Sequence, residues 1–155
     1  MLVHELMNRP VVTCSITESM NEAAQRMWER DCGVLPVVDE SLKVVGILTD
    51  RDICMAAFTQ GRPLAEISVG VGMAHDVVYC READELQEAE RAMKSHMVRR
   101  LPVLDAEGRA VGMISMNDLV RFAQSRPRRS MDREVVESLA SISAPRAALQ
   151  VAPTN

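Results

Sequence analysis

The hydrophobic residues of the chain follow two patterns that alternate along it. Two pairs of short apolar runs each flank a polar turn, at residues 39–43 and 105–109, and such pairs are typical of β-hairpins. Before each pair, apolar residues recur at three- and four-residue spacing, as Ala23 and Met27 do in the first copy, which predicts an amphipathic helix with one buried face. The pattern therefore predicts a helix followed by two strands, twice.

Local signals refine these elements. Residues 11–13 form a short extended piece before the first helix, and residues 19–22 and 84–87 have the form of a capping box, which predicts the two helix starts at Ser19 and Asp84. Pro36 and Pro102 stand inside the first strand of each hairpin. Because proline donates no hydrogen bond to a ladder, we expect these strands at an edge, or the prolines at a strand entry.

The two patterns are copies of one another. At an offset of 66 residues, positions 7–58 align without gaps on 73–124 with 15 identities in 52 positions, where unrelated sequences would share about three. Two copies are too few for a solenoid, so we expect the halves to pair face to face about a pseudo-twofold axis. The predicted fold is α/β (α+β), with two β-α-β-β-α repeats and a helical tail.

The predicted boundaries follow from the repeat. Repeat 1 covers residues 1–60, a connector 61–72, repeat 2 residues 73–125, and a tail 126–155. In the tail, Ser130 is a candidate cap for a helix over about 131–143, with Val135, Leu139 and Ile142 on one side. We expect residues 144–155 to fray.

Composition excludes several classes of function. With 18 basic and 22 acidic residues and a net charge of -4, the chain is a poor nucleic-acid binder, and the arginines at 126–129 are expected to form a solvated linker. The start has no secretory signal and no run is long enough to cross a membrane, so we expect a cytoplasmic protein. No nucleophile elbow or comparable catalytic motif is present, which predicts that the protein is not an enzyme and has no cofactor.

A short motif closes each hairpin. Its form is Gly, two apolar residues, Ser or Thr, two variable residues and Asp, and it runs from Gly46 to Asp52 and from Gly112 to Asp118. A hydroxyl at the end of a strand can cap the following helix, and the Asp can offset the helix dipole, so the motif has a purely structural explanation. The free N–H groups of the helix also make this an anion-friendly position.

Two such motifs, each preceded by Leu-Pro-Val, resemble the CBS-domain family, and the pair resembles the CBS pair (Bateman module) over about residues 1–125. The sequence shows no enzyme domain beside the pair, and in this respect it resembles stand-alone bacterial CBS proteins, which include small stress- and hypoxia-response proteins. The resemblance implies a cleft between the repeats with two sites for adenosine compounds such as AMP, ADP, ATP or S-adenosylmethionine. It also implies a homodimer formed through helical faces, and an unidentified protein partner.

The resemblance assigns roles to residues of this chain. The motif Asp would bind the ribose hydroxyls, the motif Thr or Ser would contact ribose or phosphate, and the segments 11–14 and 77–80 would bond adenine through their backbone. Basic residues before the second hairpin would grip phosphate, and because only the second repeat has such a pair, its site should bind phosphate better. The implied nucleotide-binding residues are Val12, Thr13, Gly33, Val34, Thr49, Arg51, Asp52, Val78, Arg99, Arg100, Ser115, Asn117 and Asp118.

Other interpretations remain open at this point. Arg99 and Arg100 could be solvated charges at a strand edge, and the motifs could be retained as helix caps in a ligand-independent interaction scaffold. A third hypothesis is redox or metal sensing through Cys14 and Cys80, which occupy equivalent positions and could approach across the twofold axis. His4, His75 and His96 are further metal candidates, but the histidines and cysteines do not have ligand spacing, so no metal site is expected.

Overall fold

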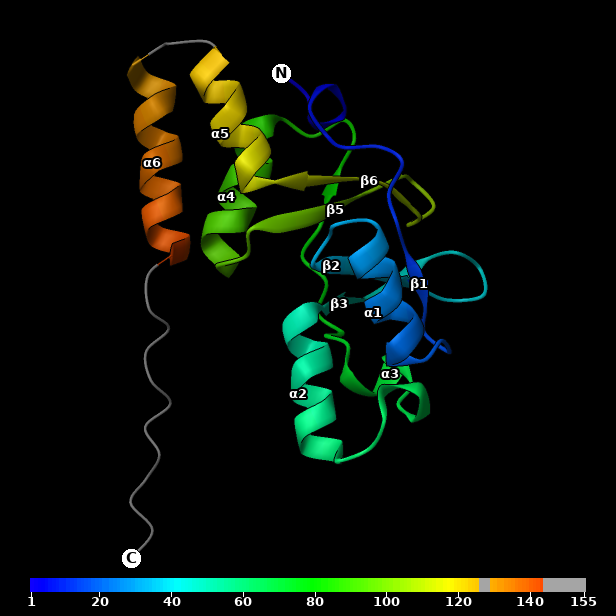
Figure 1. Cartoon of the computed structure of the whole chain (residues 1–155). Coiled ribbons are helices and arrows are strands. Elements are labelled where there is room, and N and C mark those ends of the chain that lie inside the picture. Colours follow the sequence, from blue (N-terminus) through cyan, green and yellow to red (C-terminus); the bar gives the residue numbers. More distant parts are fainter. Residues whose placement is uncertain (126–128, 144–155) are drawn as a thin grey trace, which may run out of the picture.

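Each half of the chain forms a three-stranded sheet with helices packed against it (Figure 1). The computed structural model describes residues 1–125 and 129–143, so the expectations for Arg126, Arg128 and the end at 144–155 lie outside the described residues. Arg129, which was expected in the linker, instead begins a helix. The first repeat consists of β1 (Cys14–Ser15), α1 (Met20–Glu29), β2 (Val34–Val38), β3 (Val44–Thr49) and α2 (Asp50–Gln60). The second consists of β4 (Cys80–Arg81), α4 (Leu86–His96), β5 (Arg100–Leu104), β6 (Ala110–Ser115) and α5 (Met116–Ser125). The β-α-β-β-α order is confirmed in both repeats.

Short elements connect or follow the repeats. They are η1 (Val3–Glu5), η2 (Leu64–Glu66), α3 (Val69–Gly72) and α6 (Arg129–Ser143). Among the described residues, no helix is both long and apolar enough to cross a membrane.

The middle strand of each sheet carries the proline. β2 lies between β1, its parallel partner, and β3, its antiparallel partner, and β5 has the same place in the second sheet. The expectation that Pro36 and Pro102 lie at an edge or a strand entry was wrong. The middle strand tolerates Pro36 because β1 pairs only with Val37 and Val38 and does not reach the proline.

The first helices of the two repeats, α1 and α4, begin at equivalent positions, 66 residues apart. α1 begins with the predicted capping box at Ser19. In the second repeat the predicted start was one residue off, because the cap of α4 is Glu85, whose N–H donates to the Glu88 carboxylate (3.0 Å). The Asp84 carboxylate instead accepts a hydrogen bond from the Arg81 N–H (2.7 Å), within the turn that precedes the helix.

Each repeat lends the segment before its first strand to the other repeat. Asn8 pairs with Met113 of β6, and Ala74, which lies 66 residues after Asn8, pairs with Ile47 of β3. The packing therefore crosses the predicted boundaries. The core of the second repeat contains Val3 and Met7, and the core of the first contains Ile67, Val69 and Met73.

Two glycines allow this exchange. A Cβ added at Gly46 would lie 3.0 Å from the carbonyl oxygen of Ala74, and one at Gly112 would lie 3.2 Å from that of Asn8. Both distances are tighter than ordinary contact. The glycine that opens each motif therefore lets the lent segment approach the strand backbone.

The tail helix α6 packs against α4 and α5 of the second repeat (Figure 1). As the pattern indicated, Val135 and Ile142 are buried and Leu139 packs against the core. The helix begins two residues before the expected start, so Ser130 lies within it. In the first repeat, the short elements η2 and α3 contact α1 and α2.

Candidate functional site

The two motifs form the predicted caps where a strand runs into a helix. At the end of β3, the Thr49 hydroxyl accepts a hydrogen bond from the Asp52 N–H (3.2 Å), and the Asp52 carboxylate accepts one from the Thr49 N–H (2.8 Å). Ser115 and Asp118 make the same pair of bonds at the end of β6, at 3.3 Å and 2.9 Å. The motif therefore has a structural role in both repeats.

Asp118 is held more firmly than Asp52. It is 4% exposed, and besides its bonds to Ser115 it accepts hydrogen bonds from the Asn8 amide (2.9 Å) and from the Arg121 guanidinium. Burial raises the pKa of Asp118, but the bonds from Ser115, Asn8 and Arg121 outweigh burial and hold the pKa below its ordinary value. The positions that correspond to Asn8 and Arg121 in the other repeat are Ala74 and Met55, which cannot donate such bonds.

A cavity of about 380 Å³ lies between the repeats at this second motif. Ser115 and Asp118 line it from the second repeat, and the segment before β1 and the turn before β2 line it from the first. Apolar side chains make much of the wall, and charged side chains come from both repeats. The lining residues are Asn8, Pro10, Val11, Val12, Arg30, Asp31, Cys32, Val34, Arg100, Met113, Ile114, Ser115 and Asp118.

The cavity brings together only part of the implied set. Val12, Val34, Arg100, Ser115 and Asp118 line it. A neighbouring cavity between α1 and α2 includes Gly33. The implied residues that line neither of these two cavities are Thr13, Thr49, Arg51, Asp52, Val78, Arg99 and Asn117.

The cations of the cavity differ from those implied by the resemblance. Arg100 lines it, whereas Arg99 precedes β5, is exposed and does not. The second lining cation is Arg30, at the end of α1, which the sequence did not indicate. Asn8 was missed as well. Neither residue belongs to a motif, and only the exchange of segments brings Asn8 to Asp118.

Cys14 and Cys80 lie apart in the cores of their own repeats, and both are free thiols. Burial raises the pKa of each to about 12, with a smaller contribution from a neighbouring carboxylate. The expectation that the two cysteines could meet across the twofold axis was therefore wrong. Within residues 1–125 and 129–143, His, Cys, Asp and Glu side chains form no group of three that could hold a metal ion.

The fold and the cavity define a class: paired repeats that exchange segments and share a cavity between them. Residues 3–58 and 65–125 each match the family model described as CBS domain. The chain therefore belongs to the CBS-domain family and carries the domain as a tandem pair.

Known relatives agree with this assignment. Hypoxic response protein 1 of Mycobacterium tuberculosis is 35% identical over 118 residues, which are 76% of this chain and 81% of the relative. The uncharacterized protein MK0525 of Methanopyrus kandleri is 33% identical over 119 residues, and the match covers 77% of this chain but only 61% of that protein.

Solved structures of CBS pairs superpose on the chain. The CBS domain pair of protein MJ0100, in complex with 5′-methylthioadenosine and S-adenosyl-L-methionine, matches with a TM-score of 0.72 and 28% identity over 81% of this chain and 98% of that one. CBSX2 in complex with AMP matches with a TM-score of 0.70 and 26% identity over 82% and 98%. Both neighbours bind adenosine ligands.

Proposed function

We propose that the protein is a non-catalytic, cytoplasmic regulatory module that binds an adenosine ligand of the AMP, ADP or ATP class and signals to a protein partner. One observation carries the proposal: both repeats line the cavity that contains the buried carboxylate of Asp118. A ligand in that cavity contacts both repeats at once. The adenosine ligands of the MJ0100 and CBSX2 structures support the same class.

Each part of such a ligand finds matching chemistry in the cavity. Val11, Val12 and Val34 offer apolar contacts to adenine. The carboxylate of Asp118 is a bidentate acceptor suited to the ribose diol, and binding there requires it to release some of its internal hydrogen bonds. Arg30 comes from the first repeat and can pair with phosphate.

Arg100 supplies the second cation, from the second repeat. Phosphate held between Arg30 and Arg100 would link the two repeats. A ligand that binds one arrangement of the repeats more tightly than another shifts the population toward it, and this shift is the proposed signal.

Isothermal titration calorimetry with AMP, ADP and ATP tests the proposal. We expect Arg100→Ala to weaken ATP binding by roughly tenfold, because a charge-assisted hydrogen bond is lost. Arg99→Ala is the matched control, since Arg99 is adjacent, equally basic and outside the cavity, and its affinity should stay near that of the wild type. Absence of binding by all three nucleotides would refute the proposal.

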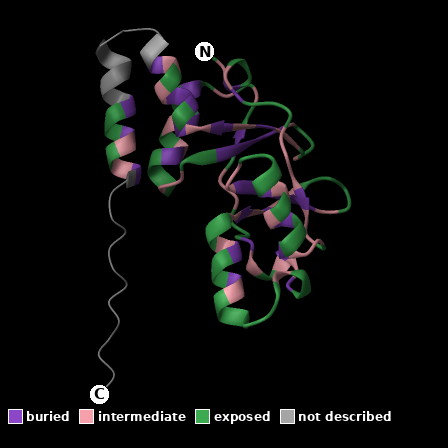
Figure 2. Cartoon of the chain, viewed as in Figure 1, coloured by how far each residue is buried: buried purple, intermediate pink, exposed green. Residues whose placement is uncertain are grey.

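A second candidate function, an interaction scaffold, is favoured by exposed apolar side chains on the first repeat. Phe58 is 78% exposed and Met55 is 46% exposed, and both lie on α2. Figure 2 shows α2 as largely exposed. Because α6 covers α4 and α5, we propose that the chain forms a homodimer through the outer faces of α1 and α2, and that a protein partner would compete for the same surface.

A further inference from the structure

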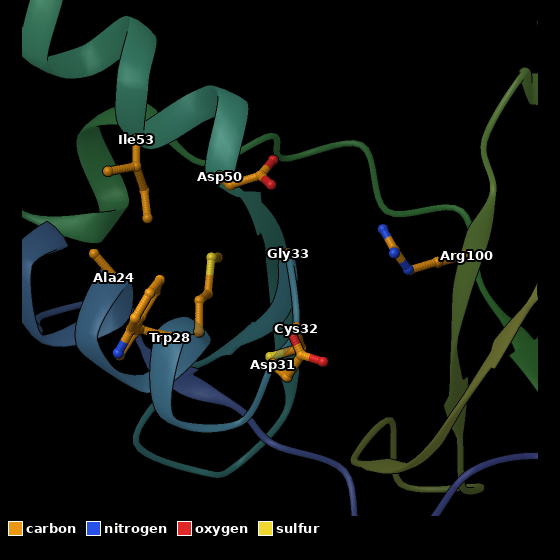
Figure 3. Close-up of a pocket in the computed structure, with 9 residues that line it drawn as sticks. Ala24, Trp28, Asp31, Cys32, Gly33, Asp50, Ile53 and Arg100 are labelled. Carbon is orange, nitrogen blue, oxygen red and sulfur yellow. The ribbon is translucent and has the colours of Figure 1, made fainter.

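A second cavity, of about 490 Å³, adjoins the first and is formed almost entirely by the first repeat (Figure 3). Its apolar wall comes from α1 and α2 and includes Trp28 and Ile53. Asp31, Cys32 and Arg100 line both cavities. The two cavities therefore meet at Arg100, the only residue that the second repeat contributes to the lining described for the second cavity.

Asp50, one of the two carboxylates that line this second cavity, has no counterpart in the second repeat. Asp50 lies against the backbone of Gly33, where an added Cβ would be 2.8 Å from Asp50 Oδ2. The equivalent of Asp50 in the second repeat is Met116, which is 2% exposed and belongs to the core. The equivalent of Gly33 is Arg99. The second repeat therefore has neither the carboxylate nor the glycine against which it lies. The repeats have therefore diverged at this cavity.

Several polar groups of the second cavity have no hydrogen-bond partner among the described residues. Asp50 Oδ1 accepts a bond from the Arg51 N–H (2.7 Å), but Oδ2 accepts none. The side chains of Asp31 and Arg100 also make no hydrogen bond or ion pair within the part of the chain that is described. In Figure 3 the Arg100 guanidinium and the Asp50 carboxylate point toward one another across open space.

These groups select a particular ligand chemistry. Trp28 is 88% exposed, and an indole face attracts organic cations. The carboxylates of Asp31 and Asp50 add attraction for positive charge, while Arg100 pairs with a carboxylate or phosphate. A group that enters from the first cavity would pass Arg100 first and reach Trp28 and Asp50 afterwards.

We propose that the second cavity is a subsite for the positively charged distal group of an adenosine ligand whose nucleoside occupies the first cavity. The inference rests on the proposed function, since it uses the first cavity as the nucleoside site. The negative group of the ligand lies at Arg100, and the positive group lies between Trp28 and Asp50. The pyridinium ring of NAD⁺ supplies such a charge, on the far side of a diphosphate that can pair with Arg100.

A pair of probes that differ in charge tests the subsite. NADH has the skeleton of NAD⁺ with an uncharged nicotinamide ring. By calorimetry we expect NAD⁺ to bind about three- to fivefold more tightly than NADH, the effect of an exposed cation–π contact beside carboxylates.

Variants and a spectroscopic signal locate the preference. Asp50→Asn and Trp28→Leu should reduce the ratio toward one while AMP affinity is retained, and Lys94→Leu, at the position equivalent to Trp28, should leave the ratio unchanged. Trp28 is the only tryptophan of the chain, so its fluorescence should change when NAD⁺ binds and stay nearly constant with AMP.

The outcomes separate this inference from the proposed function. If AMP binds but NAD⁺ is not preferred over NADH, or if the preference survives Asp50→Asn, the subsite is refuted and the nucleotide module stands. If AMP, the other nucleotides and both probes fail to bind, the proposed function fails and the subsite with it.

Discussion

The side-chain amide of Asn8 donates a hydrogen bond of 2.9 Å to Asp118, across 110 positions of sequence. Asn8 belongs to the segment that the first repeat lends to the second, and Asp118 is the last residue of the second motif. The bond therefore links the exchanged segment to the carboxylate that we propose as the acceptor of the ribose hydroxyls. Any ligand that uses Asp118 competes with this contact.

Replacing Asn8 by Ala should destabilise the fold. The variant leaves a buried carboxylate with one donor fewer, and we expect the free energy of unfolding to fall by about 1–3 kcal/mol, measured by urea denaturation. Arg9→Ala is the control, because Arg9 forms an exposed ion pair with Glu82 (3.4 Å) and such pairs contribute little. Equal stability of Asn8→Ala and wild type would contradict the role given to this bond.

Asp118 should also make the free energy of unfolding depend on pH. Its pKa in the folded protein lies below the ordinary value of 3.8, so the folded state binds fewer protons than the unfolded state. The resulting stabilisation is fully present above the unfolded pKa and is lost as the pH falls through the folded pKa.

The test compares wild type with Asp118→Asn in urea denaturation from pH 6 down to the acid limit of folding. We expect the difference in stability between the two proteins to shrink as the pH falls. Glu22 and Asp105 also have lowered pKa values, but both proteins share them, so the difference isolates Asp118. A difference that is independent of pH would show that Asp118 does not contribute through its charge.

The buried cysteines should be chemically silent in the folded protein. Because burial raises the pKa of Cys14 and Cys80 to about 12, both remain thiols at neutral pH, and the thiolate is the reactive form. With iodoacetamide at pH 7.5 we expect the exposed Cys54 to be alkylated first, and Cys14 and Cys80 to react only in urea. Peptide mass spectrometry locates the label. Rapid native labelling of Cys14 or Cys80 would revive the redox hypothesis.

The sequence predicted the two repeats, their elements and the motif caps because these depend on residues close together in the chain. The contacts that shape the cavity are of another kind. Asn8 and Arg30 belong to no motif. Asn8 reaches the second motif through the exchange of segments, and Arg30 lines the cavity from the end of α1. The 66-residue offset would have corrected one local error, since it aligns Glu85 with Ser19 and so gives the cap of α4.

Phe58 should determine the oligomeric state if the outer faces of α1 and α2 form the homodimer. A charged side chain in place of an exposed aromatic at the centre of a contact removes apolar burial and adds a desolvation cost. We expect Phe58→Glu to be monomeric by light scattering coupled to size-exclusion chromatography. Val136→Glu, at an exposed position of α6, should keep the wild-type mass. A Phe58→Glu dimer would place the interface elsewhere.

The tail helix should stabilise the second repeat through its buried face. Ile142 is 6% exposed and packs in the core of that repeat, so Ile142→Ala leaves a cavity and should lower the free energy of unfolding by about 2–5 kcal/mol. Val136 lies on the same helix but is 62% exposed, and Val136→Ala should change stability by less than about 0.5 kcal/mol. Urea denaturation of both variants decides the matter. Similar small losses would mean that α6 rests on α4 and α5 without stabilising them, and that the helical face beneath it is available to a partner.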